Sequence, residues 1–206
     1  MKKFKQLNAL AEKLRTPIYI IFEGRDGAGK SGTIDYLSQY LPPDCHEVIR
    51  SAKPSNKIMR SWIAYWNGRF KSDNKIFFYD RSHYSRALVQ RVNSWATSRQ
   101  VENFMQAVPE LENRKGLFIK VWLSITEKEQ ARRLSKRKNS KLVYWKFSDN
   151  DSLALSRFDA MTLAKQSIID ETWHVIDFND KAKGRKALLK LIVTEIKRWD
   201  YILDVP

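Results

Sequence analysis

Residues 18–41 read IYIIFEGRDGAGKSGTIDYLSQYL, and this stretch decides the fold. Its first five residues are apolar, which is typical of a strand covered on both faces of a parallel sheet. The next segment, Gly24–Ser31, matches the pattern G-x-x-x-x-G-K-[ST] in full, and residues 33–41 continue as a predicted helix. A strand, a glycine-rich loop and a helix in this order predict a phosphate-binding loop, which points backbone N–H groups and the positive end of the helix at an anion.

The loop concentrates the glycine of the chain, because four of the seven glycines lie within residues 24–32. A chain with little glycine elsewhere needs it here for backbone conformations that other residues avoid. Lys30 can reach the β and γ oxygens of a phosphate chain, and the Ser31 hydroxyl can bind Mg²⁺. The residues that we expect to contact phosphate in this segment are Gly24, Arg25, Gly27, Ala28, Gly29, Lys30, Ser31, Gly32 and Thr33.

Two carboxylates are candidate metal ligands. Asp26 lies inside the loop, where it repels phosphate unless it binds a metal or accepts a proton; a turn or helix-capping aspartate is the alternative interpretation. Asp80 ends the apolar segment 75–80 (KIFFYD), which is how a Walker B strand brings a carboxylate to the metal beside a phosphate loop. We therefore predict a Mg²⁺ site made by Asp26, Asp80 and Ser31.

Arginines follow Asp80 directly, in the sequence DRSHYSR. Arg81 and Arg86 carry planar guanidinium groups that suit tetrahedral phosphate oxygens, and the alternative is an ion pair at the surface. The predicted catalytic residues are Asp26, Lys30, Asp80, Arg81 and Arg86.

Strand-like and helix-like segments alternate along the chain. The expected strands are residues 18–23, 47–50, 75–80, 117–124 and 173–177. Capping patterns that begin at Thr97, Thr126 and Ser148 mark helix starts between them. This alternation predicts a doubly wound α/β fold with about five parallel strands, in which ligands bind at the carboxyl ends of the strands. We expect a single domain over residues 1–206, with an amphipathic helix within residues 1–16.

Residues 127–151 contain a basic arm, with eight Lys or Arg and two Glu among the first twenty residues. Arg132, Arg133 and Arg137 lie on one face of a predicted helix. Because the arm follows a strand in a kinase-like layout, we interpret it as a helical lid that closes over phosphate rather than as a solvated face. Trp145 is interpreted either as a core residue or as a surface for base stacking.

Basic residues dominate the composition: 38 Lys and Arg against 23 Asp and Glu give a net charge of +15, which favours polyanionic partners. Lys53, in the K-P-S loop after the second predicted strand, is one candidate contact to phosphate or nucleotide. A single cysteine, Cys45, excludes a disulfide scaffold and a thiolate zinc cluster within one chain. No apolar run is long enough to cross a membrane, so we expect a cytoplasmic protein without a membrane partner.

In combination, these motifs resemble those of the polyphosphate kinase 2 family. The matching segments are FEGRDGAGKSGTI at 22–34, KPS at 53–55, DRSHYSRALV at 80–89, FMQAVPELE at 104–112, EKEQARRL at 127–134, WKFSDND at 145–151 and WHVIDFNDK at 173–181. They cover most of the chain, and their combination is more specific than any single motif. His83 and Ser85 are departures, because the family usually has tryptophan and asparagine at these positions.

The resemblance implies reversible, Mg²⁺-dependent phosphoryl transfer between inorganic polyphosphate and a nucleotide, either AMP, ADP and ATP or GMP, GDP and GTP. It implies that Asp26 and Asp80 are essential carboxylates and that the protein is a homo-oligomer. The cations that it implies for phosphate binding are Lys30, Arg81 and Arg86. The lid residues that it implies for phosphate or nucleotide binding are Arg132, Arg133, Arg137, Lys146 and Asp151.

Two other functions fit parts of the sequence. The FEG-x-DGAGKS segment and the spacing of Ser85 from Asp80 fit a thymidylate-kinase-like enzyme that uses ATP, although the R-E-P-G-G loop of that family is absent. The charge by itself permits a nucleic-acid-binding P-loop protein, although the sequence lacks RNA-binding signatures with paired aromatic residues on strands. We expect polyphosphate and a nucleotide to be the substrates, rather than nucleic acid.

Overall fold

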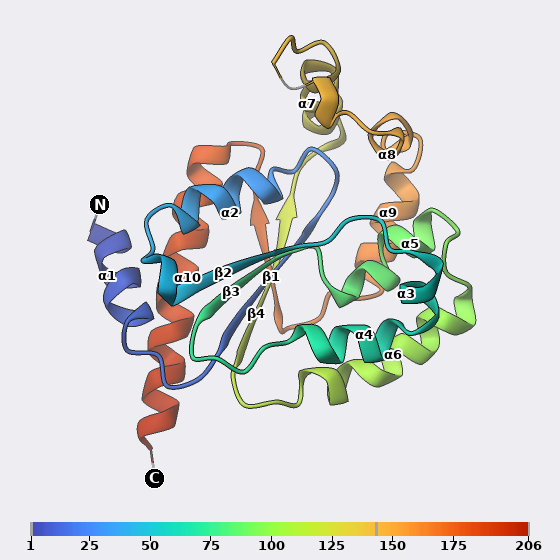
Figure 1. Ribbon diagram of the computed structural model, residues 1–206. Coiled ribbons are helices and arrows are strands. Elements are labelled where there is room, and N and C mark those ends of the chain that lie inside the picture. Colours follow the sequence, from blue (N-terminus) through green and yellow to red (C-terminus); the bar gives the residue numbers. More distant parts are fainter. Residues whose placement is uncertain (1, 143, 206) are drawn as a thin grey trace.

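The computed structural model of the protein describes residues 2–142 and 144–205, with the side chains of Lys146 and Asp149 outside that description. At its centre lies a five-stranded parallel sheet in the order β2-β3-β1-β4-β5 (Figure 1). The strands are β1 (Ile18–Gly24), β2 (His46–Arg50), β3 (Ile76–Asp80), β4 (Leu117–Ser124) and β5 (Trp173–Asp177). The predicted fold class is confirmed, and each predicted strand end lies within one residue of the observed one.

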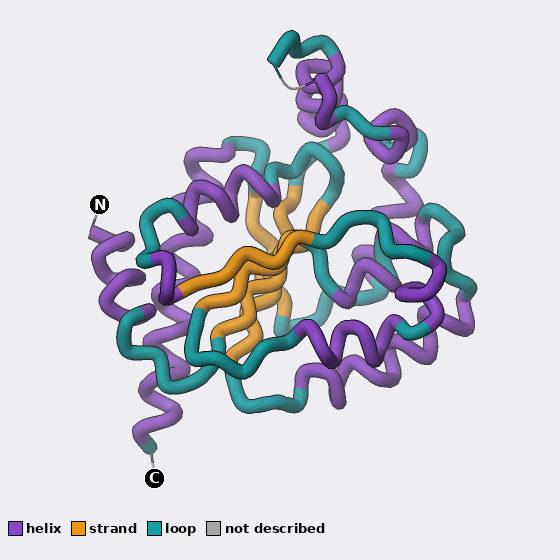
Figure 2. Tube along the Cα trace, in the orientation of Figure 1, coloured by secondary structure: helices purple, strands orange, loops and turns teal. Residues whose placement is uncertain are grey.

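The sheet is covered on both faces, as the apolar runs predicted. Every residue of β1 is buried. Ile20 and Phe22 face one core cluster, whereas Tyr19 and Ile21 face the other, because successive side chains of a strand point to opposite faces. Figure 2 shows the strands enclosed between two layers of helices.

The helices divide between these two clusters and the edge above the strands. The first layer holds α1 (Lys2–Ala11), α2 (Lys30–Ser38) and α10 (Lys181–Asp204). The second holds α3 (Asn56–Arg60), α4 (Trp62–Arg69), α5 (Val89–Val92), α6 (Ser98–Glu112) and α9 (Phe158–Gln166). Short 3₁₀ helices are η1 (Pro43–Cys45), η2 (His83–Arg86) and η3 (Tyr144–Lys146). Among the described residues, no helix is both long and apolar enough to span a membrane.

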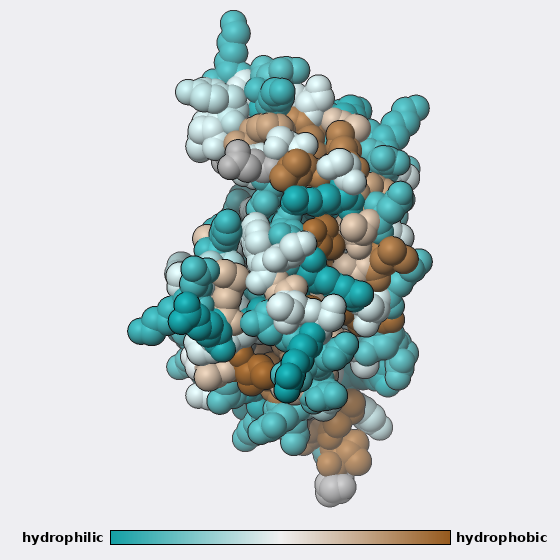
Figure 3. All heavy atoms as spheres, turned by 90° about the vertical axis from the view of Figure 1, so that its right-hand side faces the viewer, coloured by the Kyte–Doolittle hydropathy of each residue, from teal (hydrophilic) through white to brown (hydrophobic). Residues whose placement is uncertain are grey.

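The basic arm forms α7 (Glu127–Lys138), followed by η3 and α8 (Asp149–Leu153). These elements project beyond the carboxyl ends of the strands, at the top of Figure 1. Trp145 is 65% exposed, so it is a surface residue and not a core residue. Figure 3 shows a side of the molecule that is largely hydrophilic, with hydrophobic side chains gathered in small patches.

The helix starts that the capping patterns predicted are present. Thr97 forms a complete capping box with Gln100, and Ser148 does so with Asp151. At α7 the box is incomplete, because the Thr126 side chain accepts from the Glu129 N–H but the Glu129 carboxylate pairs with arginines further along the helix. The phosphate-loop helix α2 begins at Lys30, three residues earlier than predicted, because Gly29 takes a left-handed conformation as its N-cap.

Candidate phosphoryl-transfer site

The phosphate loop opens into a cavity of about 770 Å³ at the carboxyl ends of β1 and β3. The predicted residues that line it are Asp26, Gly27, Gly29, Lys30, Ser31, Gly32, Asp80, Arg81 and Arg137. Five further residues line it that the sequence analysis did not single out: Asp35, Arg50, Ser51, Lys181 and Arg185. The cavity therefore combines a few carboxylates with a larger number of cations, which suits a polyanion bound together with a metal ion.

Two positions show why the phosphate loop needs glycine. Gly24 has φ +146°, and a Cβ placed there would lie 2.7 Å from the backbone oxygen of Leu123 in the neighbouring strand. Gly29 has φ +102°, a conformation that side chains disfavour, and it begins α2. These glycines let the chain turn sharply from β1 into the helix.

Lys30 is buried at the base of the cavity. Its Nζ donates to the carbonyl oxygens of Gly24 at 2.7 Å and of Arg25 at 3.0 Å. Burial and the neighbouring Arg81 lower the pKa of Lys30, although nearby carboxylates oppose this effect. The ammonium group is thus held by backbone dipoles, next to the place where the loop is predicted to receive phosphate.

Asp26 and Arg81 form an ion pair across the cavity. Burial raises the pKa of Asp26, but Arg81, Lys30 and Arg137 outweigh it, so that the pKa lies below its ordinary value. The pKa of Arg81 is raised in turn, because carboxylates led by Asp26 outweigh its burial. Arg81 also has φ +65°, a left-handed conformation that is rare for a side chain of this size. Both groups are therefore held in their charged forms at neutral pH.

Glu23 is a supporting residue that the sequence analysis missed. Its carboxylate is buried at the end of β1 and accepts hydrogen bonds from the Ser82 N–H and Ser82 Oγ, both at 2.8 Å. Burial raises the pKa of Glu23, and Arg81 and Lys30 oppose the rise. Glu23 ties the end of β1 to the loop that carries Arg81. The sequence pattern that could have indicated Glu23 is an acidic residue directly after an apolar strand, in the segment IYIIFE.

Asp80 lies at the carboxyl end of β3, as predicted, and lines the same cavity as Asp26 and Ser31. Arg50 lies 3.8 Å from the Asp80 carboxylate and 2.5 Å from that of Asp35. All three predicted metal ligands offer oxygen atoms, and Mg²⁺ usually binds one or two carboxylates together with water and substrate phosphate. Within the described residues no group of three His, Cys, Asp or Glu side chains could hold a metal without such help. The donor set therefore fits Mg²⁺, and the Mg²⁺ site stays a prediction.

A second, open groove of about 660 Å³ lies between α7 and the start of α10. The groove and the phosphate cavity adjoin, because both are lined by the same four residues: Gly27, Gly29, Arg137 and Lys181. Cations from the lid line the groove: Arg132, Arg133, Lys136 and Arg137. Helix α7 thus faces the phosphate loop across a basic groove.

Three arginines that we predicted to bind phosphate are directed elsewhere. Arg133 donates to the backbone oxygens of Gly27, Ala28, Phe178 and Asn179, and to the Glu129 carboxylate. Arg86 donates to the Met59 carbonyl and lies over the Trp62 ring. Arg25 donates to the Phe158 carbonyl at 2.8 Å and lies over the Phe158 ring. Protein groups therefore take every guanidinium nitrogen of Arg133 and part of the donors of Arg25 and Arg86, while Nη1 of Arg86 has no partner among the described residues.

The remaining predicted residues lie around the cavity rather than in it. Ala28 and Thr33 are buried behind the loop. Asp151 is 4% exposed and accepts two hydrogen bonds from Arg137, at 2.9 and 3.0 Å, which join α8 to α7. Lys53 lies over the Trp95 ring at 4.5 Å and lines a separate cavity. The side chain of Lys146 lies outside the described part of the chain.

Lys181 and Arg185 bring α10 to the site. Lys181 lines both spaces, and Arg185 donates to the Gly32 carbonyl at 2.6 Å. Burial and the cations Arg133, Arg185 and Arg137 lower the pKa of Lys181, which shows how densely positive charge is packed here. The sequence could have indicated Lys181 and Arg185 by their position after the fifth predicted strand. A segment that follows a parallel strand begins at the same edge of the sheet as the phosphate loop.

A five-stranded parallel sheet, a phosphate loop after the central strand and a basic helix beyond the strand ends are the features of the P-loop kinase fold. The chain belongs to the polyphosphate kinase 2 family, because the family model "Polyphosphate kinase 2 (PPK2)" matches residues 1–202. This membership decides against the thymidylate-kinase-like alternative.

Curated relatives agree with the family. NDP-polyphosphate phosphotransferase 1 of Ruegeria pomeroyi is 33% identical over 95% of this chain and 68% of its own length. GDP-polyphosphate phosphotransferase of Pseudomonas aeruginosa is 35% identical over 82% of this chain and 50% of its own length. The chain thus spans half to about two thirds of the length of these two relatives.

Solved structures show the same fold. Polyphosphate kinase 2 from Arthrobacter aurescens TC1 superimposes with a TM-score of 0.85 at 23% identity, over 96% of this chain and 77% of that one. A deoxyadenosine kinase from M. mycoides with bound dATP gives a TM-score of 0.51 at 19% identity, over 88% of this chain and 99% of that one. Both structures therefore share the fold of this chain.

Proposed function

We propose that the protein is a Mg²⁺-dependent polyphosphate:nucleotide phosphotransferase, which moves a phosphoryl group reversibly between inorganic polyphosphate and a nucleoside mono- or diphosphate. The names of the curated relatives, which act on NDP, ADP or GDP with polyphosphate, support this substrate pair. The observation that carries the proposal is the basic groove that continues from the phosphate cavity between α7 and α10.

The groove suits a donor that has no base. The residues that line it are polar, cationic or small: among the described residues, no aromatic side chain borders it. Arg132, Lys136 and Lys181 add positive charge beyond the reach of the phosphate loop. A polymer with one negative charge per phosphate gains from each additional cation, whereas ATP requires a surface for adenine.

The arrangement of charges accounts for the transfer itself. Phosphoryl transfer needs little covalent chemistry from the protein, because positioning and charge neutralisation provide most of the catalysis. The loop N–H groups and Lys30 hold the donor chain, and Arg81 neutralises the transferred group. When bound by Asp26, Asp80 and Ser31, Mg²⁺ supplies further neutralisation of phosphate oxygens. For transfer, the acceptor oxygen would approach the phosphorus atom in line with the bond to the donor chain.

The proposal is tested by supplying long-chain polyphosphate and Mg²⁺ with AMP, ADP, GMP or GDP and following the higher nucleotides by chromatography. We expect product that disappears when polyphosphate is left out. Transfer from ATP to a nucleoside monophosphate, with none from polyphosphate, would overturn the proposal.

A variant pair tests the groove. Arg132→Gln with Lys136→Gln removes two lid cations, and we expect the KM for long-chain polyphosphate to rise about tenfold, with a smaller rise for tripolyphosphate. The matched control is Lys186→Gln with Lys190→Gln, which removes the same charge from exposed positions of α10 that do not line the groove. An equal rise in the KM for polyphosphate in both double variants would show that only the net charge of the protein matters, and would contradict binding in the groove.

A further inference from the structure

A third cavity, of about 180 Å³, adjoins the phosphate cavity. The two cavities share Ser51 and Arg81. A group attached to a phosphate at Arg81 can therefore extend into this third cavity. Its walls come from the loop after β2, from α4, from the segment between β3 and α6, and from α8: Ser51, Ala52, Lys53, Pro54, Trp62, Arg81, Ser85, Val89, Gln90, Trp95 and Asn150.

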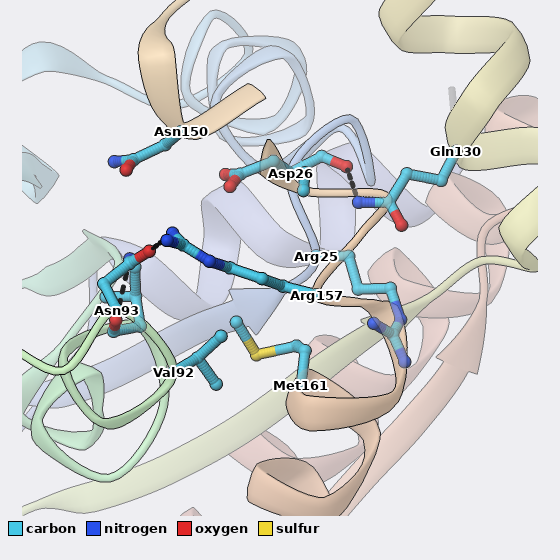
Figure 4. A pocket seen from close by; sticks show the side chains of 10 residues that line it. Arg25, Asp26, Val92, Asn93, Gln130, Asn150, Arg157 and Met161 are labelled. Atoms are coloured by element: carbon cyan, nitrogen blue, oxygen red, sulfur yellow. Dashed lines mark hydrogen bonds between the residues drawn. The ribbon is translucent and has the colours of Figure 1, made fainter. Parts of the chain in front are cut away.

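The wall is suited to a flat heterocycle. Trp62 and Trp95 supply aromatic rings, and the Trp62 Nε1 is fixed by a hydrogen bond to the His83 carbonyl at 2.9 Å. Asn150, from the lid helix α8, lines this cavity and also the adjacent small pocket of Figure 4. Asp26 of the phosphate loop lines the small pocket of Figure 4 as well, so Asn150 borders both the third cavity and a pocket beside the phosphate loop.

Gln90 is the unusual member of this wall. It is completely buried, and neither its Nε2 nor its Oε1 has a hydrogen-bond partner among the described residues. Its backbone oxygen accepts from the N–H groups of Trp95 and Ala96, which fixes the main chain. A buried amide without partners is costly, and such a group in a native protein calls for an explanation. Because it makes no hydrogen bond to the protein, turning the amide into the cavity breaks none.

We infer that Gln90 reads the purine edge of the acceptor nucleotide; this inference rests on the proposed function. The amide offers one donor beside one acceptor. This pair complements the N6 amino group and N1 of adenine, and after a half-turn of the amide it complements O6 and N1–H of guanine. The site therefore accepts both purines, because the amide can present either order of donor and acceptor.

A change in the donor and acceptor pattern tests the inference. Gln90→Glu leaves two acceptors, which match the adjacent N1–H and N2–H donors of guanine and repel N1 of adenine. Lys53 and Arg81 in the same wall favour an ionised carboxylate there. We expect the ratio of kcat/KM for GDP to that for ADP to rise at least tenfold, since a bidentate contact discriminates strongly between bases. The matched control is Gln106→Glu, on an exposed position of α6, which should leave the ratio unchanged.

A second variant avoids the added charge. Gln90→Met keeps the length of the side chain but removes both polar atoms. Wild type should prefer ADP about tenfold over the diphosphate of purine riboside, which lacks the N6 amino group, and Gln90→Met should lose this preference. Thermal melting of each variant establishes that it is folded.

Direct binding of ADP and GDP by calorimetry separates this inference from the proposed function. A shifted binding ratio in Gln90→Glu supports the base contact even if no polyphosphate-dependent turnover is found. An unchanged binding ratio, together with an ADP preference that survives in Gln90→Met, would overturn it. Failure of wild type to bind either nucleotide would overturn both proposals.

Discussion

Arg133 lies against the phosphate loop and donates a hydrogen bond to the Gly27 carbonyl at 3.1 Å. The same guanidinium reaches the Ala28 and Phe178 carbonyls, at 3.0 and 2.6 Å. One lid residue thus joins α7 to the phosphate loop and to the end of β5. Helix α7 is therefore tied to the body of the molecule at Arg133.

Replacing Arg133 should cost stability. Arg133→Met leaves several backbone oxygens without their donor, and buried groups that lose a charged partner typically cost about 3 kcal/mol. For a chain of this size that lowers Tm by roughly 6–12 °C in calorimetry. Arg132→Met is the control, because Arg132 shares the partner Glu129 but is 63% exposed, and its Tm should change by at most about 2 °C. Equal melting temperatures for the two variants would contradict this role of Arg133.

Removing either cavity carboxylate should abolish turnover without unfolding the protein. Asp26→Asn and Asp80→Asn keep the shape of the side chain and lose the charge predicted to hold Mg²⁺. We expect kcat with polyphosphate to fall by about 10³-fold or more, by analogy with the loss of other charge-stabilising groups. Circular dichroism should stay unchanged, and Asp73→Asn, in an exposed loop, serves as the control. Near-normal turnover in either cavity variant would refute the metal assignment.

The lid helix should make stability depend on acid pH. Hydrogen bonds from Arg132 and Arg133 lower the pKa of Glu129 from its ordinary 4.5 to about 2. Because the folded-state pKa is depressed, this stabilisation is complete above about pH 4.5 and is lost as the pH falls towards 2. Glu129→Gln should therefore show a shallower fall of Tm between about pH 4.5 and about pH 2, measured by calorimetry. Identical pH profiles for wild type and variant would argue against the shift.

Lys181 should matter for the donor, although it was not among the predicted site residues. It borders both the phosphate cavity and the basic groove, so Lys181→Gln should lower kcat/KM for polyphosphate by about tenfold to a hundredfold. Lys183→Gln removes the same charge two residues further along α10, at an exposed position that lines neither space. The two variants should differ by at least about fivefold in steady-state assays, since a salt bridge to phosphate is local. Indistinguishable kinetics would remove Lys181 from the donor path.

Much of the site was accessible from local patterns. The segment GRDGAGKS predicted the turn from β1 into α2, because glycine, lysine and serine at that spacing have a local geometric purpose. Asp80 was found because it ends an apolar strand, and the carboxyl ends of parallel strands meet at one edge. The local pattern did not indicate where the Arg86 side chain lies: the η2 turn directs it towards Met59 and Trp62, and its contact with phosphate stays a prediction.

The sequence by itself determined the succession of strands and helices along the chain, the phosphate loop and the edge of the sheet at which ligands are expected to bind. These features depend on the spacing of apolar residues, on glycine and on helix-capping residues, all of which act over a few neighbouring residues. Only the tertiary structure decided which cations face the cavity. Arg133 and Arg137 are four residues apart on one helix, yet backbone oxygens from distant elements take the donors of the first, while the second lines the cavity. Long arginine side chains reach whatever acceptors the fold brings near, and that proximity depends on contacts between elements far apart in the chain.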